Sequence, residues 1–224
     1  MKTLLTVLSN YMSTYAAVII CVSLCILVPY LLGSVNFALV ISKTSFKDDI
    51  REHGSGNAGM TNMLRTYGKV AALATLLCDM FKGAVAVIFG NFLIGYFGAY
   101  MAGFFCIFGH IFPIFFKFKG GKGVATLAAI VLTLDLMQVT FCFLLLFSIF
   151  LILVIGTKYV SLGSVICCMI YPIIVARIGA IGFQFIFSFL SGAIIVFMHR
   201  ENIKRLLNHT ENKISLSKKS KEKK

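Results

Sequence analysis

Residues 18–42 read VIICVSLCILVPYLLGSVNFALVIS, a run of 25 residues without a charged side chain. About 20 such residues are enough for an α-helix to cross the hydrocarbon core of a bilayer. Six further apolar segments follow, at residues 67–89, 94–116, 124–134, 136–156, 160–176 and 181–198. The chain is 59% hydrophobic and only 13% charged, which excludes an ordinary soluble domain. The sequence therefore predicts an all-α, polytopic integral membrane helix bundle of about seven transmembrane helices.

The fourth segment is too short to cross the membrane as an upright helix. Its 11 residues, 124–134, measure about 16 Å as a helix, roughly half of the hydrocarbon core. It either crosses as a tilted helix backed by water or dips into the membrane and returns. Between the second and third segments, we expect a short turn around Gly90 and Asn91.

The basic residues fall mainly into alternate loops. They follow the first, third and fifth segments and continue in the tail, whereas the opposite loops hold Asp135, Arg177 and little else. Positively charged loops stay in the cytoplasm, so we expect the amino end outside and the carboxyl end inside. We interpret residues 1–17 as a retained amino-terminal extension, 18–211 as the membrane domain and 212–224 as a basic cytoplasmic tail.

The net charge is +13, and nine of the 21 basic residues lie after His199. Such a tail can bind nucleic acid or touch anionic lipid at the membrane surface. No aromatic side chain lies among the tail lysines to stack on a base, so we expect contact with membrane lipid and no nucleic-acid partner. The seven cysteines lie in apolar runs without metal-ligand spacing, so no metal ion and no cofactor is expected.

Two opposite charges lie within the second apolar segment. Asp79 and Lys82 are three residues apart and share one helix face, where they can neutralise each other. Either charge alone would be costly against lipid. We favour a structural role for this pair, and a substrate or proton site is the alternative.

Three polar clusters are expected on the same side of the membrane. The first, residues 48–69, combines glycines with hydroxyl, amide and guanidinium groups, a combination that suits an anionic ligand rich in oxygen. Its candidate ligand-binding residues are Arg51, Ser55, Asn57, Thr61, Asn62 and Arg65.

The second cluster is a glycine-wrapped lysine, Gly120, Gly121, Lys122 and Gly123. Glycine N–H groups at the start of a helix can hold a phosphate, to which the lysine adds a positive charge. The segment is not a nucleotide-binding P-loop, because Phe116 replaces the required glycine and Gly123 the required serine or threonine. We therefore expect phosphate binding without nucleotide hydrolysis.

The third cluster, residues 199–211, is predicted to be helical. His199 and Asn202 then lie on its apolar face and point back at the protein. Two small polar residues near segment ends are weaker candidates, namely Ser34 and Ser161.

These clusters resemble the three signature motifs of the bacterial acyl-phosphate-dependent glycerol-3-phosphate acyltransferases. The matching stretches are GSGNAGMTNMLR at 54–65, GHIFPIFFKFKGGKGVAT at 109–126 and HRENIKRLLNHTE at 199–211. Three positions depart from the family pattern: Asn36 replaces a frequent proline, Met60 an alanine and His209 a glycine. Histidine is among the residues that tolerate a positive φ, and the sequence leaves open how His209 affects the turn before Glu211.

The resemblance implies a seven-helix enzyme of the bacterial cytoplasmic (inner) membrane, with its active site on the cytoplasmic face. It would transfer a fatty acyl group from acyl phosphate to the sn-1 hydroxyl of glycerol 3-phosphate, the first acylation step of phospholipid biosynthesis. The products would be lysophosphatidate and phosphate. Its functional partner would be the enzyme that makes acyl phosphate, and we expect a monomer.

We assign the candidate residues to four roles. The glycine–lysine cluster, Gly120 to Gly123, is expected to bind the phosphate of glycerol 3-phosphate. The catalytic residues that complete this pocket are expected to be Ser34, Arg51, His199 and Asn202. Residues expected to orient the acyl phosphate or the loop are Ser55, Asn57, Thr61, Asn62, Arg65 and Ser161. Residues expected to be structural are Asp79, Lys82 and Glu211.

The sequence leaves the general base open between His199 and the bound substrate phosphate, and we favour the phosphate. No histidine is followed by aspartate five residues later, the H-x-x-x-x-D pattern of acyl-CoA-dependent acyltransferases, which favours acyl phosphate as the donor. The alternative function is a membrane transporter of a phosphorylated small solute. Transporters bind near the bilayer midplane, whereas these clusters lie at one edge, so we favour the enzyme.

Overall fold

The computed structural model describes residues 3–138, 141–179 and 182–214, and it contains helices and no β-strand within those ranges. The prediction of an all-α fold is therefore confirmed. The elements are α1 Leu4–Leu8, α2 Thr14–Ser34, α3 Phe37–Ser45, η1 Ile50–Glu52, α4 Met60–Thr66, α5 Lys69–Ile94, α6 Tyr96–Ile111, η2 Ile114–Phe116, α7 Val124–Gln138, α8 Cys142–Thr157, α9 Val160–Arg177, α10 Phe183–Met198 and α11 Arg200–Leu207.

Each of the seven predicted apolar segments contains a helix. Among the described residues, four helical stretches are long and apolar enough to cross a membrane, and α10 with α11 makes a fifth if that pair, bent by 58°, is one span. Helices α7 and α8, with 15 and 16 residues, are apolar but shorter. The number of seven crossings and the orientation of the ends stay predictions.

The turn expected at Gly90 and Asn91 is wrong. Both residues lie inside α5, and the chain turns instead at Gly95, whose φ is +71°. Gly90 serves a close approach of two helices, because a Cβ there would collide with the carbonyl oxygen of Gly98 in α6. Small residues allow membrane helices to pack at such short separations. A glycine that marks helix packing was therefore interpreted as one that marks a turn.

The first apolar run is broken between α2 and α3, at Val35 and Asn36. Asn36 caps the amino end of α3, because its Oδ1 accepts a hydrogen bond from the backbone N–H of Leu39, 3.1 Å away. The carbonyls freed at the break, those of Gly33 and Val35, accept hydrogen bonds from Lys82 Nζ at 3.0 and 2.8 Å. A lysine of α5 thus satisfies a break in a neighbouring helix.

The predicted Asp79–Lys82 ion pair is present in the interior of the bundle. Lys82 Nζ lies 2.9 Å from Asp79 Oδ1, and only 1% and 3% of the two side chains are exposed. His110 of α6 joins the pair through its Nδ1, 2.9 Å from Lys82 Nζ. The buried Lys82 ammonium is therefore compensated by the Asp79 carboxylate and by the carbonyl oxygens of Gly33 and Val35. Burial of either charge without such partners would be strongly unfavourable.

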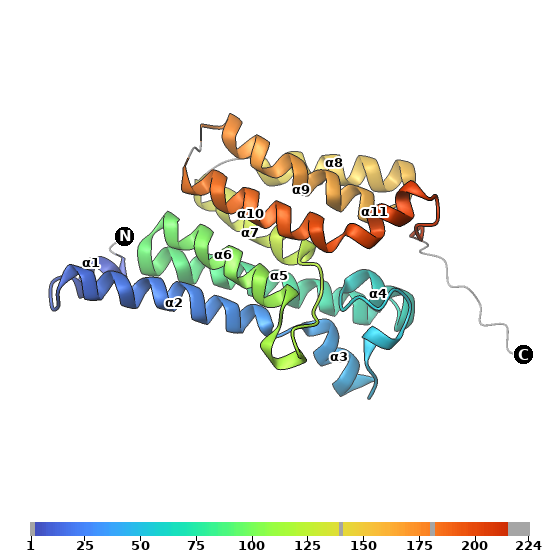
Figure 1. Ribbon diagram of the computed structural model, residues 1–224, viewed down its shortest axis with the longest axis horizontal. Coiled ribbons are helices and arrows are strands. Elements are labelled where there is room, and N and C mark those ends of the chain that lie inside the picture. Colours follow the sequence, from blue (N-terminus) through green and yellow to red (C-terminus); the bar gives the residue numbers. More distant parts are fainter. Residues whose placement is uncertain (1–2, 139–140, 180–181, 215–224) are drawn as a thin grey trace, which may run out of the picture.

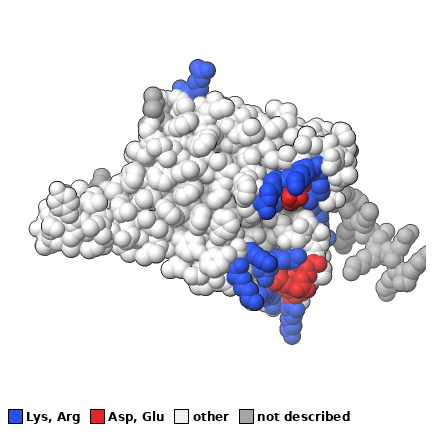
Figure 2. All heavy atoms as spheres, in the orientation of Figure 1, with Lys and Arg blue, Asp and Glu red and all other residues white. Residues whose placement is uncertain are grey.

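The helices lie side by side along the long axis of the molecule (Figure 1). Helix α5 packs against α2, α6 and α7, and helix α9 against α8 and α10. The short helices α3, α4 and α11 gather at one end, opposite α1 (Figure 1). Most charged side chains on the visible face lie at that same end, and the flanks are almost free of charge (Figure 2). The three polar clusters are therefore collected at one edge of an apolar bundle.

Candidate active site

A cavity of about 430 Å³ opens at the charged end of the bundle. It is lined by polar groups from all three clusters and by apolar side chains that come mainly from α7, α8 and α9. The polar lining includes Ser55, Asn57, Thr61, Asn62, Arg65, Lys122, Ser161, His199, Asn202, Arg205 and Glu211. The apolar lining includes Leu127, Val131, Phe143, Leu146, Phe147, Phe150 and Tyr171. A single cavity thus has both a polar and an apolar lining.

Glu211 connects the second and third clusters. Its Oε1 accepts hydrogen bonds from Asn202 Nδ2 at 2.8 Å and from Ser161 Oγ at 2.9 Å. Because the NH₂ of Asn202 is directed at this carboxylate, its Oδ1 faces the other way and accepts a hydrogen bond from Lys122 Nζ. A carboxylate at the end of the third cluster thereby sets the position of the lysine in the second.

The turn that delivers Glu211 starts at His209, the position where the family pattern has glycine. The φ of His209 is +55°, so the histidine adopts the left-handed conformation that a glycine would favour there, and the turn is kept. After the turn, Glu211 Oε2 accepts a hydrogen bond from Arg205 Nε at 2.8 Å. Burial raises the pKa of Glu211, but the bonds from Arg205, Asn202 and Ser161 outweigh it and lower the pKa below its ordinary value. Glu211 is therefore an anion at neutral pH.

Positive charge nevertheless dominates the polar part of the cavity. Arg65, Lys122 and Arg205 all line it, and only Arg205 is paired directly with Glu211. Burial, followed by the charge of Arg205, lowers the pKa of Lys122 from 10.5 to about 8. Two effects disfavour the ammonium form of Lys122, desolvation and nearby cations, and a bound anion would relieve the second. The site therefore suits a ligand with at least two negative charges.

His199 stands where α10 ends and α11 begins, and 3% of it is exposed. Its Nδ1 lies 2.8 Å from the carbonyl oxygen of Ile195. A carbonyl can only accept a hydrogen bond, so Nδ1 carries the proton and Nε2 is the free acceptor nitrogen of the neutral ring. A histidine in this state can accept a hydrogen bond from a ligand hydroxyl.

Asn62 organises the loop of the first cluster. Its Nδ2 donates to the carbonyl oxygens of Ile50 at 3.0 Å and His53 at 2.9 Å, and its Oδ1 accepts from the N–H of Ser55 at 3.0 Å. Three bonds from one buried amide fix the loop over residues 50–55. This leaves the side chain of Ser55 at the cavity wall, with Asn57 and Thr61 beside it.

The structure corrects the expected role of Gly120 and Gly121. Their N–H groups donate to the carbonyl oxygens of Ile111 at 3.1 Å and His110 at 3.2 Å, so they are occupied by the protein itself. Glycine is needed for space at both positions: a Cβ on Gly121 would collide with His110 Nε2 and the carbonyl of Ala58. Of this cluster, Lys122 and Gly123 line the cavity.

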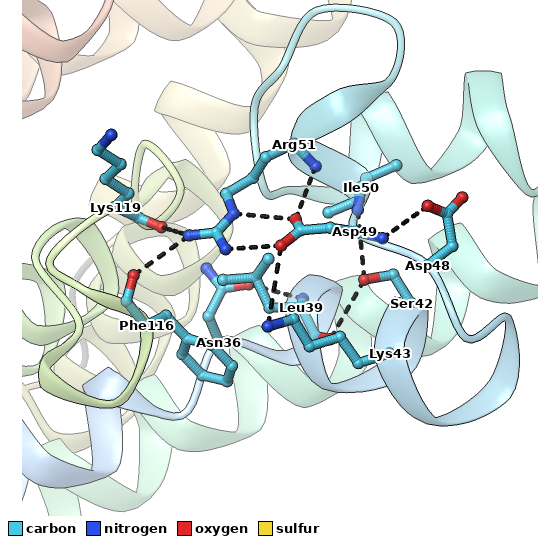
Figure 3. Close-up of polar contacts among 10 residues, drawn as sticks. All are labelled: Asn36, Leu39, Ser42, Lys43, Asp48, Asp49, Ile50, Arg51, Phe116 and Lys119. Carbon is cyan, nitrogen blue, oxygen red and sulfur yellow. Dashed lines mark hydrogen bonds and ion pairs between the residues drawn. The ribbon is translucent and has the colours of Figure 1, made fainter.

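Ser34 and Arg51, predicted to complete the phosphate pocket, are outside the residues that line the cavity. Ser34 Oγ donates to the carbonyl of Tyr30 at 2.8 Å and accepts from the N–H of Ile114 at 3.4 Å. Arg51 is bound to Asp49 and to the loop before Gly120 (Figure 3). Both residues support the loop from behind, whereas Ser55 and Arg65 occupy the positions at the wall that were expected for them.

Polar residues of the cavity wall that were not among the candidates include Arg205 and His110, and Asp79, for which a structural role was favoured, also lines the cavity. Arg205 was detectable, because it follows Asn202 by three residues and so lies near it on the same side of the helix. His110 and Asp79 reach the cavity from buried positions that only the packing of α5 against α6 defines. No group of three or more His, Cys, Asp or Glu side chains in residues 3–138, 141–179 and 182–214 could hold a metal ion.

Comparison with known proteins gives a consistent result. A model of the family described as glycerol-3-phosphate acyltransferase matches residues 23–209. The glycerol-3-phosphate acyltransferase of Finegoldia magna is 44% identical over 192 residues, which cover 84% of this chain and 93% of that protein. The one of Agrobacterium fabrum is 40% identical over 193 residues, 86% and 91% of the two chains.

The fold also matches solved structures of PlsY, an integral membrane glycerol 3-phosphate acyltransferase. The TM-score is 0.80 for its glycerol 3-phosphate form and 0.77 for its lysophosphatidic acid form. Sequence identity is 32% and 31%, and each match covers 87% of this chain and 96% of the other.

Proposed function

The chain belongs to the glycerol-3-phosphate acyltransferase family, and we propose that it transfers a fatty acyl group from acyl phosphate to the sn-1 hydroxyl of glycerol 3-phosphate. The products are lysophosphatidate and inorganic phosphate. The observation that carries this proposal is the single cavity in which Arg65, Lys122 and Arg205 lie beside an apolar wall. Both substrates combine these two chemistries, since one is a phosphate ester and the other a phosphate on a hydrocarbon chain.

The cationic end of the cavity binds the phosphate of glycerol 3-phosphate. Lys122 and Arg65 supply charge, and Asn202 holds Lys122 in place. Guanidinium groups hold phosphate oxygens with two parallel bonds, whereas an ammonium acts as a point charge. Ser55 adds a hydroxyl beside Arg65 at the wall. Lys122 and Asn202 were already expected in this pocket, and Ser55 and Arg65 take the places that were expected for Ser34, Arg51 and the glycine N–H groups.

The apolar wall between α7, α8 and α9 holds the acyl chain. This part of the cavity is lined by Phe147 and Phe150 of α8, with Val131 of α7 and Tyr171 of α9. The carbonyl carbon of the donor then lies where the apolar and cationic parts meet. Acyl phosphate is a mixed anhydride with a good leaving group, so the reaction mainly needs a hydroxyl placed next to that carbon and control of the phosphate charge.

His199 positions the attacking hydroxyl. Its Nε2 accepts a hydrogen bond from the neighbouring sn-2 hydroxyl, while the carbonyl of Ile195 holds Nδ1, so the proton of the sn-1 hydroxyl is left for a substrate phosphate. The hydroxyl proton passes to a substrate phosphate, whose second pKa of about 6 leaves it basic at neutral pH. This assignment is supported by the partner of Nδ1: it is a carbonyl, not a carboxylate that would stabilise an imidazolium.

The enzyme works at the cytoplasmic face of the bacterial inner membrane. This is supported by the charged end of the molecule, which carries the cavity and most basic residues of the visible face. We expect the enzyme to act as a monomer. Its functional partner is the enzyme that makes acyl phosphate, which delivers the donor to the same leaflet.

Purified protein given acyl phosphate and glycerol 3-phosphate tests this function. We expect lysophosphatidate to form from acyl phosphate and not from acyl-CoA at equal concentration. Ester formation from acyl-CoA alone would contradict the assigned donor. Uptake of glycerol 3-phosphate into liposomes that contain the protein, without any ester, would favour a transporter.

A further inference from the structure

Asp49 and Arg51 form a rigid pair next to the loop that carries Lys122. The guanidinium holds the Asp49 carboxylate by two bonds, Nε to Oδ1 at 2.9 Å and Nη2 to Oδ2 at 2.6 Å (Figure 3). Asp49 also accepts from the N–H of Arg51 at 3.0 Å. The bonds from Arg51 outweigh burial and lower the pKa of Asp49 to about 2. The pair stays ionised over the whole physiological range.

The third nitrogen of the same guanidinium binds the loop between α6 and α7. Arg51 Nη1 donates to the carbonyl oxygens of Phe116 and Lys119, both at 3.2 Å (Figure 3). The two residues between these carbonyls are Lys117 and Phe118, and each has a φ of +57°. Consecutive non-glycine residues in this region are strained, and such backbone persists only where its surroundings hold it. Arg51 therefore spans the strained turn from one side to the other.

The turn lies directly before the part of the loop that faces the cavity. Lys119 is followed by Gly120 and Gly121, whose N–H groups are bound to α6, and then by Lys122. The loop is thus fixed by Arg51 on one side and by α6 on the other. Lys122 reaches the cavity from the end of this doubly held segment.

We propose that Asp49 and Arg51, here called the clamp, position Lys122 and so set the affinity for the phosphorylated acceptor without touching it. This rests on the proposed function, because it takes the Lys122 pocket as the acceptor site. Arg51 is then a positioning residue, and Asp49 orients it. The carbonyls of Phe116 and Lys119 are the points where the clamp acts.

Arg51→Gln tests the clamp, with Lys43→Gln as the matched control. Lys43 Nζ lies 3.8 Å from the same carboxylate, and its side chain is half exposed, so the control removes one positive charge beside Asp49 and keeps both carbonyl bonds. We expect Arg51→Gln to raise the KM for glycerol 3-phosphate about tenfold with kcat and the KM for acyl phosphate changed less than about threefold. Lys43→Gln should leave all three constants near those of the wild type.

A second measurement reports on the environment of Lys122 and does not depend on enzymatic turnover. Labelling of Lys122 by an amine-reactive reagent, measured by peptide mass spectrometry as a function of pH, reports the midpoint of its titration. Lys122 is faced by Arg205, Arg65, Glu211 and His199, and burial is the main cause of its lowered pKa. When the loop relaxes in Arg51→Gln, Lys122 gains water, and the midpoint should move upward, toward 10.5.

Two further variants keep the test decisive if Arg51→Gln cannot be purified. Arg51→Lys keeps the charge but cannot hold the carboxylate with two bonds while reaching both carbonyls, so it should raise the acceptor KM as well. Asp49→Asn should act in the same direction.

The clamp is overturned if these variants lower the melting temperature and leave the acceptor KM and the Lys122 midpoint unchanged. An equal effect of Lys43→Gln would also overturn it, because the effect would then be one of general charge. Absence of acyl transfer by the wild type would refute the proposed function, and the labelling comparison would still decide the clamp.

Discussion

Lys122 donates a hydrogen bond to Asn202, a residue 80 positions later in the chain. The bond joins the loop before α7 to helix α11, and Glu211 fixes its direction by accepting from the Asn202 NH₂. Two of the three polar clusters are thereby locked together at the mouth of the cavity. Most of the expected behaviour of the site follows from this contact.

The first prediction concerns pH. Lys122 binds the acceptor phosphate as an ammonium, and burial with the Arg205 charge lowers its pKa to about 8. Below that pH the lysine is charged and binding is favoured; above it the proton is lost and the KM for glycerol 3-phosphate should rise. A profile of kcat/KM against pH should therefore fall on the alkaline side from about 8. In Lys122→Arg this fall should disappear, because arginine stays charged throughout.

The second prediction separates two serines. Ser55 lies at the cavity wall, whereas Ser34 is bound to the backbone behind the loop. A hydrogen bond to a charged group contributes about 1.5–3 kcal/mol, so Ser55→Ala should lower kcat/KM roughly 10- to 100-fold. Ser34→Ala should mainly lower the melting temperature. If Ser34→Ala lowered kcat/KM more than Ser55→Ala does, the result would support the phosphate pocket that was expected from the sequence.

Parts of this site were predictable because they are local in the chain. The pairing of Asp79 with Lys82 follows from helix spacing, and the three clusters from composition. The place of Arg51 was not predictable, because its partners Phe116 and Lys119 are 65 and 68 residues away. An arginine beside a glycine-rich loop suggested a ligand, and nothing local showed that backbone carbonyls occupy it.

Glycines were the least predictable residues for a related reason. A glycine can permit a positive φ, expose an N–H group or allow another backbone to approach, and the sequence alone does not separate these uses. Gly90 was interpreted as a turn residue and Gly121 as a residue with an exposed N–H group. In the structure, both glycines allow another part of the backbone to approach closely. The break between α2 and α3 was likewise hidden, since it is satisfied by Lys82 from another helix.

The third prediction tests how Glu211 acts. In Glu211→Gln, an amide NH₂ must face either the Asn202 NH₂ or Arg205 Nε, so one present bond is lost. If the NH₂ takes the place of Oε1, Asn202 is free to turn and Lys122 loses its acceptor; if it takes the place of Oε2, Arg205 loses its partner at the cavity wall. We expect about a tenfold or greater fall in kcat/KM, with a higher acceptor KM.

The matched control for Glu211→Gln is Glu201→Gln. That carboxylate is exposed on α11, and its ion pair among the described residues is with Lys204, at 3.4 Å. It should leave kcat/KM near the wild-type value. If both variants behave alike, Glu211 acts through net charge and not through Asn202.

The fourth prediction concerns the buried ion pair. Asp79→Asn leaves the Lys82 ammonium without its counter-ion in the interior, and breaking such a pair costs about 3–5 kcal/mol. The purified variant should melt at a lower temperature in detergent, with activity per folded molecule retained. Since Asp79 also reaches the cavity wall, unchanged melting with abolished activity would instead give this carboxylate a part in the chemistry.

Release of inorganic phosphate from acyl phosphate by the purified protein, with and without glycerol 3-phosphate, is the most direct measurement of the proposed reaction. The expected result is release that depends on glycerol 3-phosphate, equals the lysophosphatidate formed mole for mole, and is lost in Lys122→Met. Phosphate release that is unaffected by glycerol 3-phosphate or by the loss of Lys122 would contradict acyl transfer at this cavity.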